Sequence, residues 1–139
     1  MKTLKPVVQE ERTGCGIACV TMLSNQSYQH TRKIAKQLGI FAEDPELWSE
    51  TVYVRNLLAH LKIKISDREK PFQDWNRLPD RALLAIKWHV ENGIPFWHWT
   101  VFVREGQQGY VLDPKKALKN NLRTDFGRMK PKWFIEVFL

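Results

Sequence analysis

Cysteine is scarce in this sequence, and long hydrophobic runs are absent. The 139 residues include two cysteines, Cys15 and Cys19, which are too few for the disulfide framework of a small secreted protein. No apolar stretch reaches the ~18 residues that a membrane-spanning helix needs, and the amino end has no hydrophobic signal segment. We therefore expect a soluble chain, and among the compartments we favour the cytoplasm.

Internal repeats and low-complexity segments are also absent from the pattern. Hydrophobic residues make up 43% of the chain and charged residues 27%, a balance typical of globular proteins. A chain of this length can bury roughly two thirds of its unfolded surface, which is enough for a core without disulfides. We expect residues 1–139 to form a single domain.

Acidic residues are outnumbered, since 22 Lys and Arg stand against 15 Asp and Glu and the net charge is +7. Such a charge suits an acidic protein partner or inhibitor, an anionic lipid or nucleic acid. No nucleic-acid-binding motif accompanies the basic residues, so we expect them to face water and do not favour a nucleic-acid partner. The densest groups are Lys115, Lys116, Lys119 and Arg123, followed by Arg128, Lys130 and Lys132.

Helical periodicity dominates the first half of the chain and strand patterns dominate the second half. The helices that we expect run from Gly14 onward, from a capping Ser27 to Gly39, and over residues 51–61. The extended segments that we expect are residues 5–9, 63–66, 82–90, 97–105, 109–114 and 132–139, with a loop at 41–50 and a helical turn near Trp75. Helices that precede an antiparallel meander predict an α+β fold.

Cys15 stands between two glycines at the start of the first predicted helix. Unpaired backbone N–H groups and the helix dipole favour a thiolate there, which is the nucleophilic form of the side chain. Gly14 and Gly16 would leave room for a substrate backbone, so both are candidates for substrate binding. Free cysteines are also often buried, and Cys15 alone therefore leaves a structural role equally open.

A cysteine nucleophile needs a base, and the base needs an orienting group. His98 in one predicted strand and Asp113 at the end of the next form the best pair. A hairpin that turns at residues 106–109 would bring the two side chains together, with a register open by a residue or two. His89 is the rival base if the register differs.

Gln9 lies six residues before Cys15, so a short extended segment could bring its carboxamide beside the thiol. There it would stabilise a developing oxyanion together with the Cys15 backbone N–H. Trp97 and Trp99 flank His98 and would project from the opposite face of the strand, where they could wall a peptide groove.

The second cysteine fits a role in the core. Cys19 shares a helix face with Cys15, but a structural zinc site needs four ligands, and a disulfide between the two would distort the helix. We expect neither a metal nor another cofactor. For His30 and His60 we expect surface or core roles.

Four motifs carry a resemblance to a known family, namely Gln9, Cys15-Gly-Ile-Ala-Cys19, His98-Trp-Thr-Val-Phe-Val and Tyr110-Val-Leu-Asp-Pro. With these motifs the sequence resembles the papain-like cysteine peptidases that process bacteriocin leader peptides. The resemblance spans residues 5–114 in element order. It implies that Cys15 is the nucleophile, His98 the base and acid, Asp113 the orienting group and Gln9 the oxyanion donor. Relatives are often the amino-terminal domain of a membrane transporter, whereas this chain has no such segment.

We therefore expect a cysteine peptidase that cleaves a peptide or protein substrate. The same four groups would serve deamidation or another amide or acyl transfer in a toxin or effector domain. A third reading is a catalytically silent binding module of the same fold, which would use its basic surface for an acidic partner.

Overall fold

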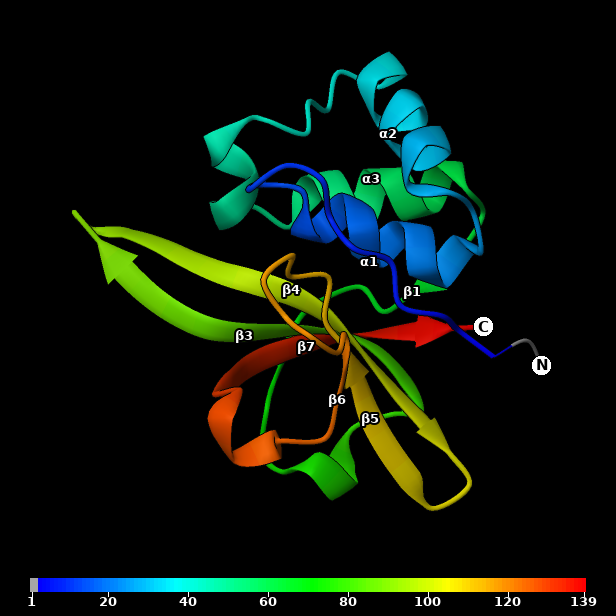
Figure 1. Ribbon diagram of the computed structural model, residues 1–139. Helices are drawn as coiled ribbons and strands as arrows, with labels where there is room; N and C mark the ends of the chain where they lie inside the picture. The colour runs from blue at the N-terminus through cyan, green and yellow to red at the C-terminus, as the bar shows by residue number, and fades with distance from the viewer. Residues whose placement is uncertain (1–2) are drawn as a thin grey trace.

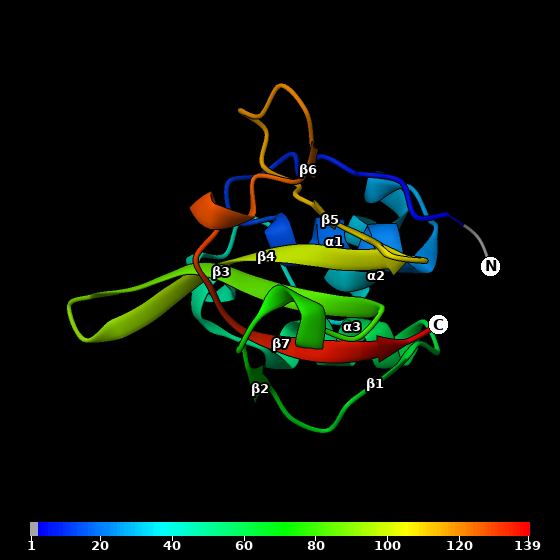
Figure 2. The same ribbon diagram turned by 90° about the horizontal axis from the view of Figure 1, so that it is seen from below.

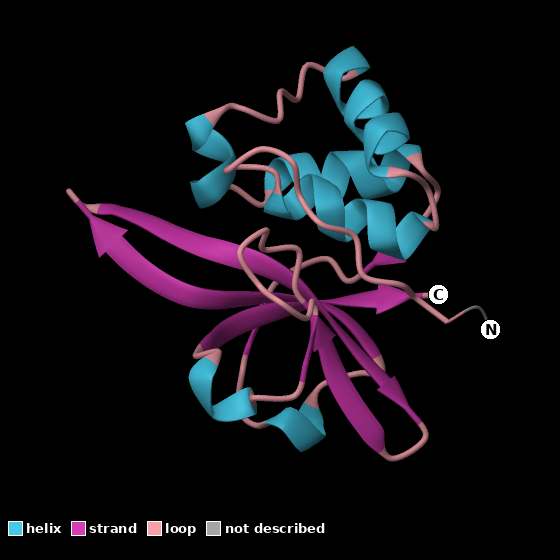
Figure 3. Ribbon diagram, viewed as in Figure 1, coloured by secondary structure: helices cyan, strands magenta, loops and turns pink. Residues whose placement is uncertain are grey.

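The three α-helices of the described residues cover one face of a twisted antiparallel sheet. A computed structural model describes residues 3–139, and Figure 1 shows the helical layer above the strands. Colouring by secondary structure separates the two halves, because the helices precede nearly all of the strands along the chain (Figure 3). The predicted α+β order is confirmed.

The helical layer consists of three α-helices, and short 3-10 helices lie in the connections. Their bounds are α1 (Cys15–Ser24), α2 (Tyr28–Gln37), α3 (Val52–His60), η1 (Pro45–Ser49), η2 (Trp75–Arg77) and η3 (Phe126–Arg128). All residues of α1 from Cys15 to Leu23 are buried. A helix that is apolar all round suits a central position between other elements, and α1 contacts β4 of the sheet as well as α2 and α3.

The residues that the sequence indicated as the start and the end of α2 have these roles in the structure. The Ser27 hydroxyl accepts a hydrogen bond from the His30 backbone N–H at 3.1 Å, so it caps the helix as expected. Gly39 follows the helix with φ of 81°, a conformation that glycine adopts without steric cost. The loop predicted at 41–50 contains η1, whose first turn begins at Pro45.

Seven strands form the sheet within residues 3–139, in the order β1-β7-β3-β4-β5-β6, with β2 also paired to β7. Their bounds are β1 (Lys64–Ile65), β2 (Lys70–Pro71), β3 (Arg81–Glu91), β4 (Ile94–Glu105), β5 (Gln108–Leu112), β6 (Leu122–Arg123) and β7 (Pro131–Phe138). The predicted meander is β3-β4-β5. The last strand returns to the far side of β3, as the view from below shows (Figure 2).

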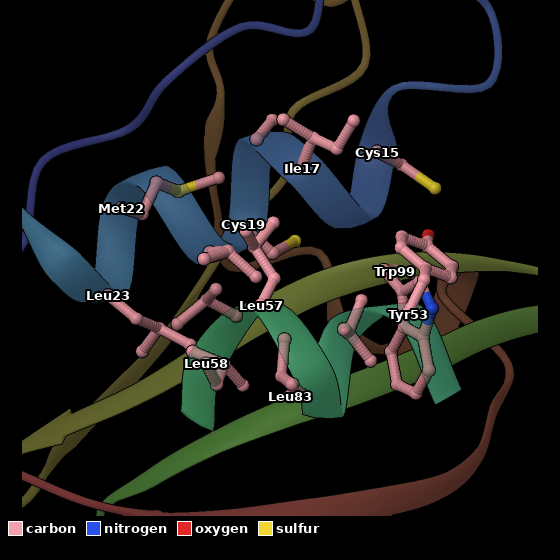
Figure 4. Packing of buried hydrophobic residues seen from close by; sticks show 14 of the residues in the cluster. Cys15, Ile17, Cys19, Met22, Leu23, Tyr53, Leu57, Leu58, Leu83 and Trp99 are labelled. Carbon is pink, nitrogen blue, oxygen red and sulfur yellow. The ribbon is translucent and has the colours of Figure 1, made fainter. Parts of the chain in front are cut away.

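Both faces of the first half of β3 are buried up to Ile86, which explains the unbroken run of apolar residues from Ala82 to Ile86. Leu83 and Ala85 face the helices in the larger hydrophobic cluster. Leu84 and Ile86 face the opposite side, where Phe102 and the η2 and η3 segments form a second cluster. Figure 4 shows the helix-side cluster, with Cys15 and Cys19 of α1 above Leu83 of the sheet.

The outer half of the β3-β4 hairpin extends beyond the helical layer (Figure 1). Its register shifts between Ile86 and His89, so β3 carries a bulge where it leaves the core. Bulges bend a strand and often occur beside active sites. The inner end of this hairpin holds His98, which pairs with Ile86.

Candidate active site

His98 and Asp113 are hydrogen-bonded to each other, with 2.7 Å between His98 Nε2 and Asp113 Oδ1. The β4-β5 register pairs Val101 with Leu112. Continued by one residue, this register places Asp113 opposite Thr100, so His98 is its diagonal neighbour on the same face of the sheet. The register that the sequence left open therefore brings the two side chains together.

Asp113 is fully buried and held from three sides. The Lys115 backbone N–H donates to Oδ1 at 3.0 Å, and the Arg123 Nη1 donates to Oδ2 at 2.8 Å. Burial alone would raise the pKa of Asp113, but the hydrogen bonds and charges of His98, Lys115 and Arg123 outweigh it and lower the pKa to about 2. Asp113 is therefore a permanent carboxylate at neutral pH.

The environment of His98 favours its protonated form. Burial lowers the pKa of the imidazole, but hydrogen bonds to Asp113 and to the Cys15 thiol more than offset this effect and raise the pKa to about 9. Because Nε2 is bonded to Asp113, the other ring nitrogen is the one available to Cys15. The ring thus connects the sulfur to the buried carboxylate.

Cys15 is the first residue of α1, as predicted, and its side chain is covered. Its exposed fraction is 1%. Figure 4 shows its sulfur on the side of Tyr53 and Trp99. The sulfur therefore lies at the start of a helix, where dipole and free N–H groups favour an anion, but beneath the molecular surface in this structure.

Tyrosine hydroxyls occupy the space beside the two glycines that flank Cys15. A Cβ at Gly16 would lie 2.0 Å from the Tyr53 hydroxyl oxygen, and one at Gly14 would lie 2.3 Å from that of Tyr28. Both glycines are buried. Their small size therefore has a packing reason within the chain, and their contact with a substrate stays a prediction.

Gln9 lines the same cleft as His98 and lies next to the residues that follow Asp113. Its backbone N–H donates to the carbonyl of Pro114 at 2.9 Å. Its side-chain Nε2 donates to the carbonyls of Glu11 at 2.8 Å and Arg12 at 2.9 Å, while its buried Oε1 has no hydrogen-bond partner in residues 3–139. In this arrangement the amide hydrogens are used by the loop that leads to Cys15.

A cleft of about 390 Å³ opens over this region and is lined by Gln9, Trp97 and His98. The other lining residues are Arg12, Trp48, Lys87, His89, Glu91, Phe96 and Lys115. Trp97 therefore contributes to the cleft wall, and its contact with a substrate stays a prediction. Trp99 is 0% exposed and belongs to the helix-side core, so in this structure it does not line the cleft.

The remaining candidates do not bond Asp113. Cys19 is fully buried, and burial raises the pKa of its thiol well above the ordinary value. His89 lines the cleft and stacks on Phe96, but it is His98 that bonds Asp113. His30 and His60 are exposed on α2 and α3. Within residues 3–139 no group of His, Cys, Asp or Glu is arranged to hold a metal ion.

Arg123 was not recognised from the sequence as part of this site. It was grouped there with lysines expected to face water, and that expectation is wrong for Arg123, because its side chain is 9% exposed and bonded to Asp113. Its Nε and Nη2 also donate to the Asp125 carboxylate. The spacing Arg123-Thr-Asp125 is a local signal for the bond between these two side chains. The bond from Arg123 to Asp113 depends instead on the β5-β6 pairing.

Structural comparison identifies solved peptidase domains with the same fold. The peptidase domain of Streptococcus ComA, a bifunctional ABC transporter of a quorum-sensing pathway, superposes with a TM-score of 0.64 at 14% identity, covering 97% of this chain and 98% of that one. The fold is that of a papain-like peptidase domain. A double-glycine-motif protease from an AMS/PCAT transporter, solved with its leader peptide, gives 0.59 at 14% identity, covering 97% and 91%.

The structural likeness extends beyond the segment in which the sequence motifs lie. It covers 97% of this chain, whereas the sequence resemblance was confined to residues 5–114. No family model and no curated protein matches the sequence, so the likeness concerns the fold. Of the helices in residues 3–139, none is both long and apolar enough to cross a membrane.

Proposed function

We propose that this chain is a cysteine peptidase in which Cys15 is the nucleophile. The observation that carries the proposal is the position of His98, which hydrogen-bonds the buried Asp113 at 2.7 Å and lies near enough to the Cys15 thiol for that group to raise its pKa. A nucleophile, a base and an orienting carboxylate in contact form the arrangement that acyl transfer requires. The papain-like fold supports the same assignment.

In the first half of the reaction, His98 carries the proton of the Cys15 thiol, as its raised pKa favours, and the sulfur attacks the scissile carbonyl carbon as the thiolate. The new C–S bond moves the carbonyl electrons onto oxygen. When the tetrahedral intermediate collapses, the C–N bond breaks and His98 gives its proton to the leaving amine. In the second half, His98 accepts a proton from water, the hydroxide attacks the acyl carbon, and the sulfur leaves as the thiolate beside protonated His98.

The oxyanion is stabilised by the backbone N–H of Cys15, which lies in the first turn of α1 and has no acceptor within the helix. Gln9 is the proposed second donor. Its Nε2 bonds to the carbonyls of Glu11 and Arg12, so donation to a substrate requires it to release one of them. An extended peptide is the proposed substrate, a choice supported by the leader peptide bound to the second structural neighbour.

The buried sulfur favours a second candidate function. With Cys15 at 1% exposure, a catalytically silent module that binds a peptide in the cleft is the competing proposal. The two differ in turnover. A deamidase, the other use of the same four groups, would convert glutamine to glutamate in the peptide without cutting the chain.

Incubation of the purified chain with a complex peptide library, followed by mass spectrometry, tests these alternatives. The peptidase proposal expects new peptide ends that disappear in Cys15→Ala and in His98→Gln. Cys19→Ala is the matched control and should retain the cuts. A library that remains uncut by the folded wild-type chain would overturn the peptidase proposal.

A further inference from the structure

The cleft beside His98 carries an excess of positive charge that the chain does not neutralise. Arg12, Lys87 and Lys115 line it, with Glu91 as the single carboxylate among its lining residues. Glu91 lies 3.9 Å from His89. The three cations form no ion pair with any carboxylate of residues 3–139.

Lys87 reaches the cleft because of the bulge in β3. Its φ is 56°, a left-handed value that is uncommon for residues other than glycine, and its N–H donates to the Lys130 carbonyl at 3.1 Å. A bulge changes the direction in which a side chain points. The bulge thus interrupts the regular alternation of side chains between the two faces of β3 and places Lys87 on the cleft wall.

Lys115 lies close enough to Lys87 to affect its ionisation. Burial, followed by the positive charges of Lys115 and Arg123, lowers the pKa of Lys87. Asp113 is the nearby anion that opposes this effect, but its carboxylate is already bonded to His98 and Arg123. A bound anion between the two lysines would relieve the repulsion.

This cationic pair adjoins the catalytic groups. The backbone N–H of Lys115 donates at 3.0 Å to Asp113 Oδ1, the same oxygen that bonds His98. The backbone of Lys115 is therefore fixed relative to the imidazole. A group held by Lys115 would lie within a short distance of the bond that Cys15 attacks.

Two residues that line the cleft carry buried polar atoms without a partner among the described residues, which is a second feature that a peptide ligand would satisfy. Gln9 Oε1 and Trp97 Nε1 have no hydrogen-bond partner in residues 3–139, and their side chains are 7% and 6% exposed. Both residues line the cleft. Buried polar atoms are normally paired, and a peptide backbone supplies the N–H for the acceptor and the C=O for the donor.

We infer that the cleft binds a peptide carboxylate between Lys87 and Lys115, beside the scissile bond. Only the position beside a scissile bond rests on the proposed function, because the binding of the carboxylate itself needs no turnover. The carboxylate comes from an Asp or Glu side chain or from a free carboxyl end. Arg12, which lies over the Trp48 ring at 5.6 Å, adds positive charge at the rim.

Binding is measured by fluorescence anisotropy on the Cys15→Ala chain, which cannot turn the peptide over. The probes are labelled random octapeptide pools with a fixed central Asp or Asn, each with a free or an amidated carboxyl end. The amidated Asp pool should bind about tenfold tighter than the amidated Asn pool, since charge-assisted hydrogen bonds are the stronger ones. A preference confined to free carboxyl ends would instead identify the terminal carboxylate as the ligand.

Charge variants locate the site. Lys87→Gln combined with Lys115→Gln should abolish the preference, and Lys87→Glu combined with Lys115→Glu should reverse it toward a pool with a central Lys. Lys119→Gln is the control, because this lysine is exposed and does not line the cleft. Equal binding of the Asp and Asn pools with either carboxyl end, no binding of any pool, or an equal loss in Lys119→Gln would overturn the inference.

The same pools, given to the wild-type chain, separate this inference from the proposed function. Cleavage without a preference for acidic peptides leaves the peptidase standing and removes the carboxylate site. Carboxylate-dependent binding without cleavage supports the carboxylate site and removes the peptidase proposal. The chain would then be a binding module with an anion-selective cleft.

Discussion

His98 Nε2 lies 2.7 Å from Asp113 Oδ1, and the carboxylate that it contacts is fully buried. A buried charge is stable only when it is paired and hydrogen-bonded. Asp113 meets this condition through His98 on one oxygen and Arg123 on the other. The orientation of the imidazole is therefore built into the fold, and several measurable consequences follow from that contact.

Stability should fall as the pH rises through the range in which His98 titrates. The folded pKa of about 9 lies above the ordinary 6.5, so the folded state holds a proton that the unfolded state has released. The contribution is fully present below about pH 6.5 and is lost as the pH approaches 9. Denaturant unfolding should show a slope of at most about 1.4 kcal/mol per pH unit from this group.

His98→Gln should remove this slope, whereas His60→Gln, an exposed histidine on α3, should leave it in place. Equal pH profiles for wild type and His98→Gln between pH 6.5 and 9 would show that the imidazole is not held as described.

Loss of Arg123 should destabilise the fold and shift its acid unfolding. Removing one partner of a buried ion pair typically costs about 3 kcal/mol or more, and Arg123→Gln leaves Asp113 with His98 and one backbone N–H. The stabilisation from Asp113 is present above its ordinary pKa of 3.8 and is lost as the pH falls toward about 2. In Arg123→Gln the loss should begin at a higher pH.

The neighbouring exposed Arg128 supplies the control for this prediction. Arg128→Gln should change the free energy of unfolding by no more than about 0.5 kcal/mol. If Arg123→Gln behaves in the same way, the bond to Asp113 contributes little in solution.

The sequence predicted those parts of the site that depend on local signals. Cys15 was placed at a helix start by its glycines and by the apolar residues after it, and His98 and Asp113 were placed on adjacent strands by the turn between them. Arg123 was missed because its contact with Asp113 is made through a two-residue pairing of β5 and β6. Such short strands carry no periodic signal.

The burial of Cys15 and the bulge at Lys87 were also beyond the sequence pattern. Burial of the sulfur depends on α3, which brings Tyr53 against Gly16. The bulge depends on the way β7 and β4 flank β3 with shifted registers. Both are consequences of tertiary packing, which local propensity does not report.

The glycine after Cys15 should be intolerant of any side chain. A Cβ at Gly16 would lie 2.0 Å from the Tyr53 hydroxyl oxygen and 2.6 Å from the adjacent ring carbon, so Gly16→Ala forces the tyrosine to move. Overpacking of this kind costs about 1–3 kcal/mol. Thermal unfolding should show the loss.

Gly14→Ala makes a useful comparison, because its closest contact is a hydroxyl alone. The Tyr28 oxygen would lie 2.3 Å from the new Cβ, followed by the Glu11 carbonyl oxygen at 3.2 Å. Tyr28→Phe should therefore recover part of the stability lost in Gly14→Ala. Additive losses in the double variant would mean that the clash is relieved in another way.

Cys19 should matter for stability and not for chemistry. Its side chain is fully buried in the helix-side core, and removal of its sulfur leaves a small cavity. Cys19→Ala should lower the free energy of unfolding by about 1 kcal/mol while peptide cleavage continues. Unchanged melting would argue against close packing around this thiol.

The central claim is that His98 activates Cys15, and iodoacetamide labelling of the folded chain tests it most directly. Peptide mass separates the two cysteines, and the urea-unfolded chain gives the reference rate. At about pH 6.5 the account predicts that Cys15 labels faster than in the unfolded chain, that His98→Gln removes this advantage, and that Cys19 stays unlabelled because burial raises its pKa. Labelling of Cys15 that is slower than in the unfolded chain, or unaffected by His98→Gln, would contradict it.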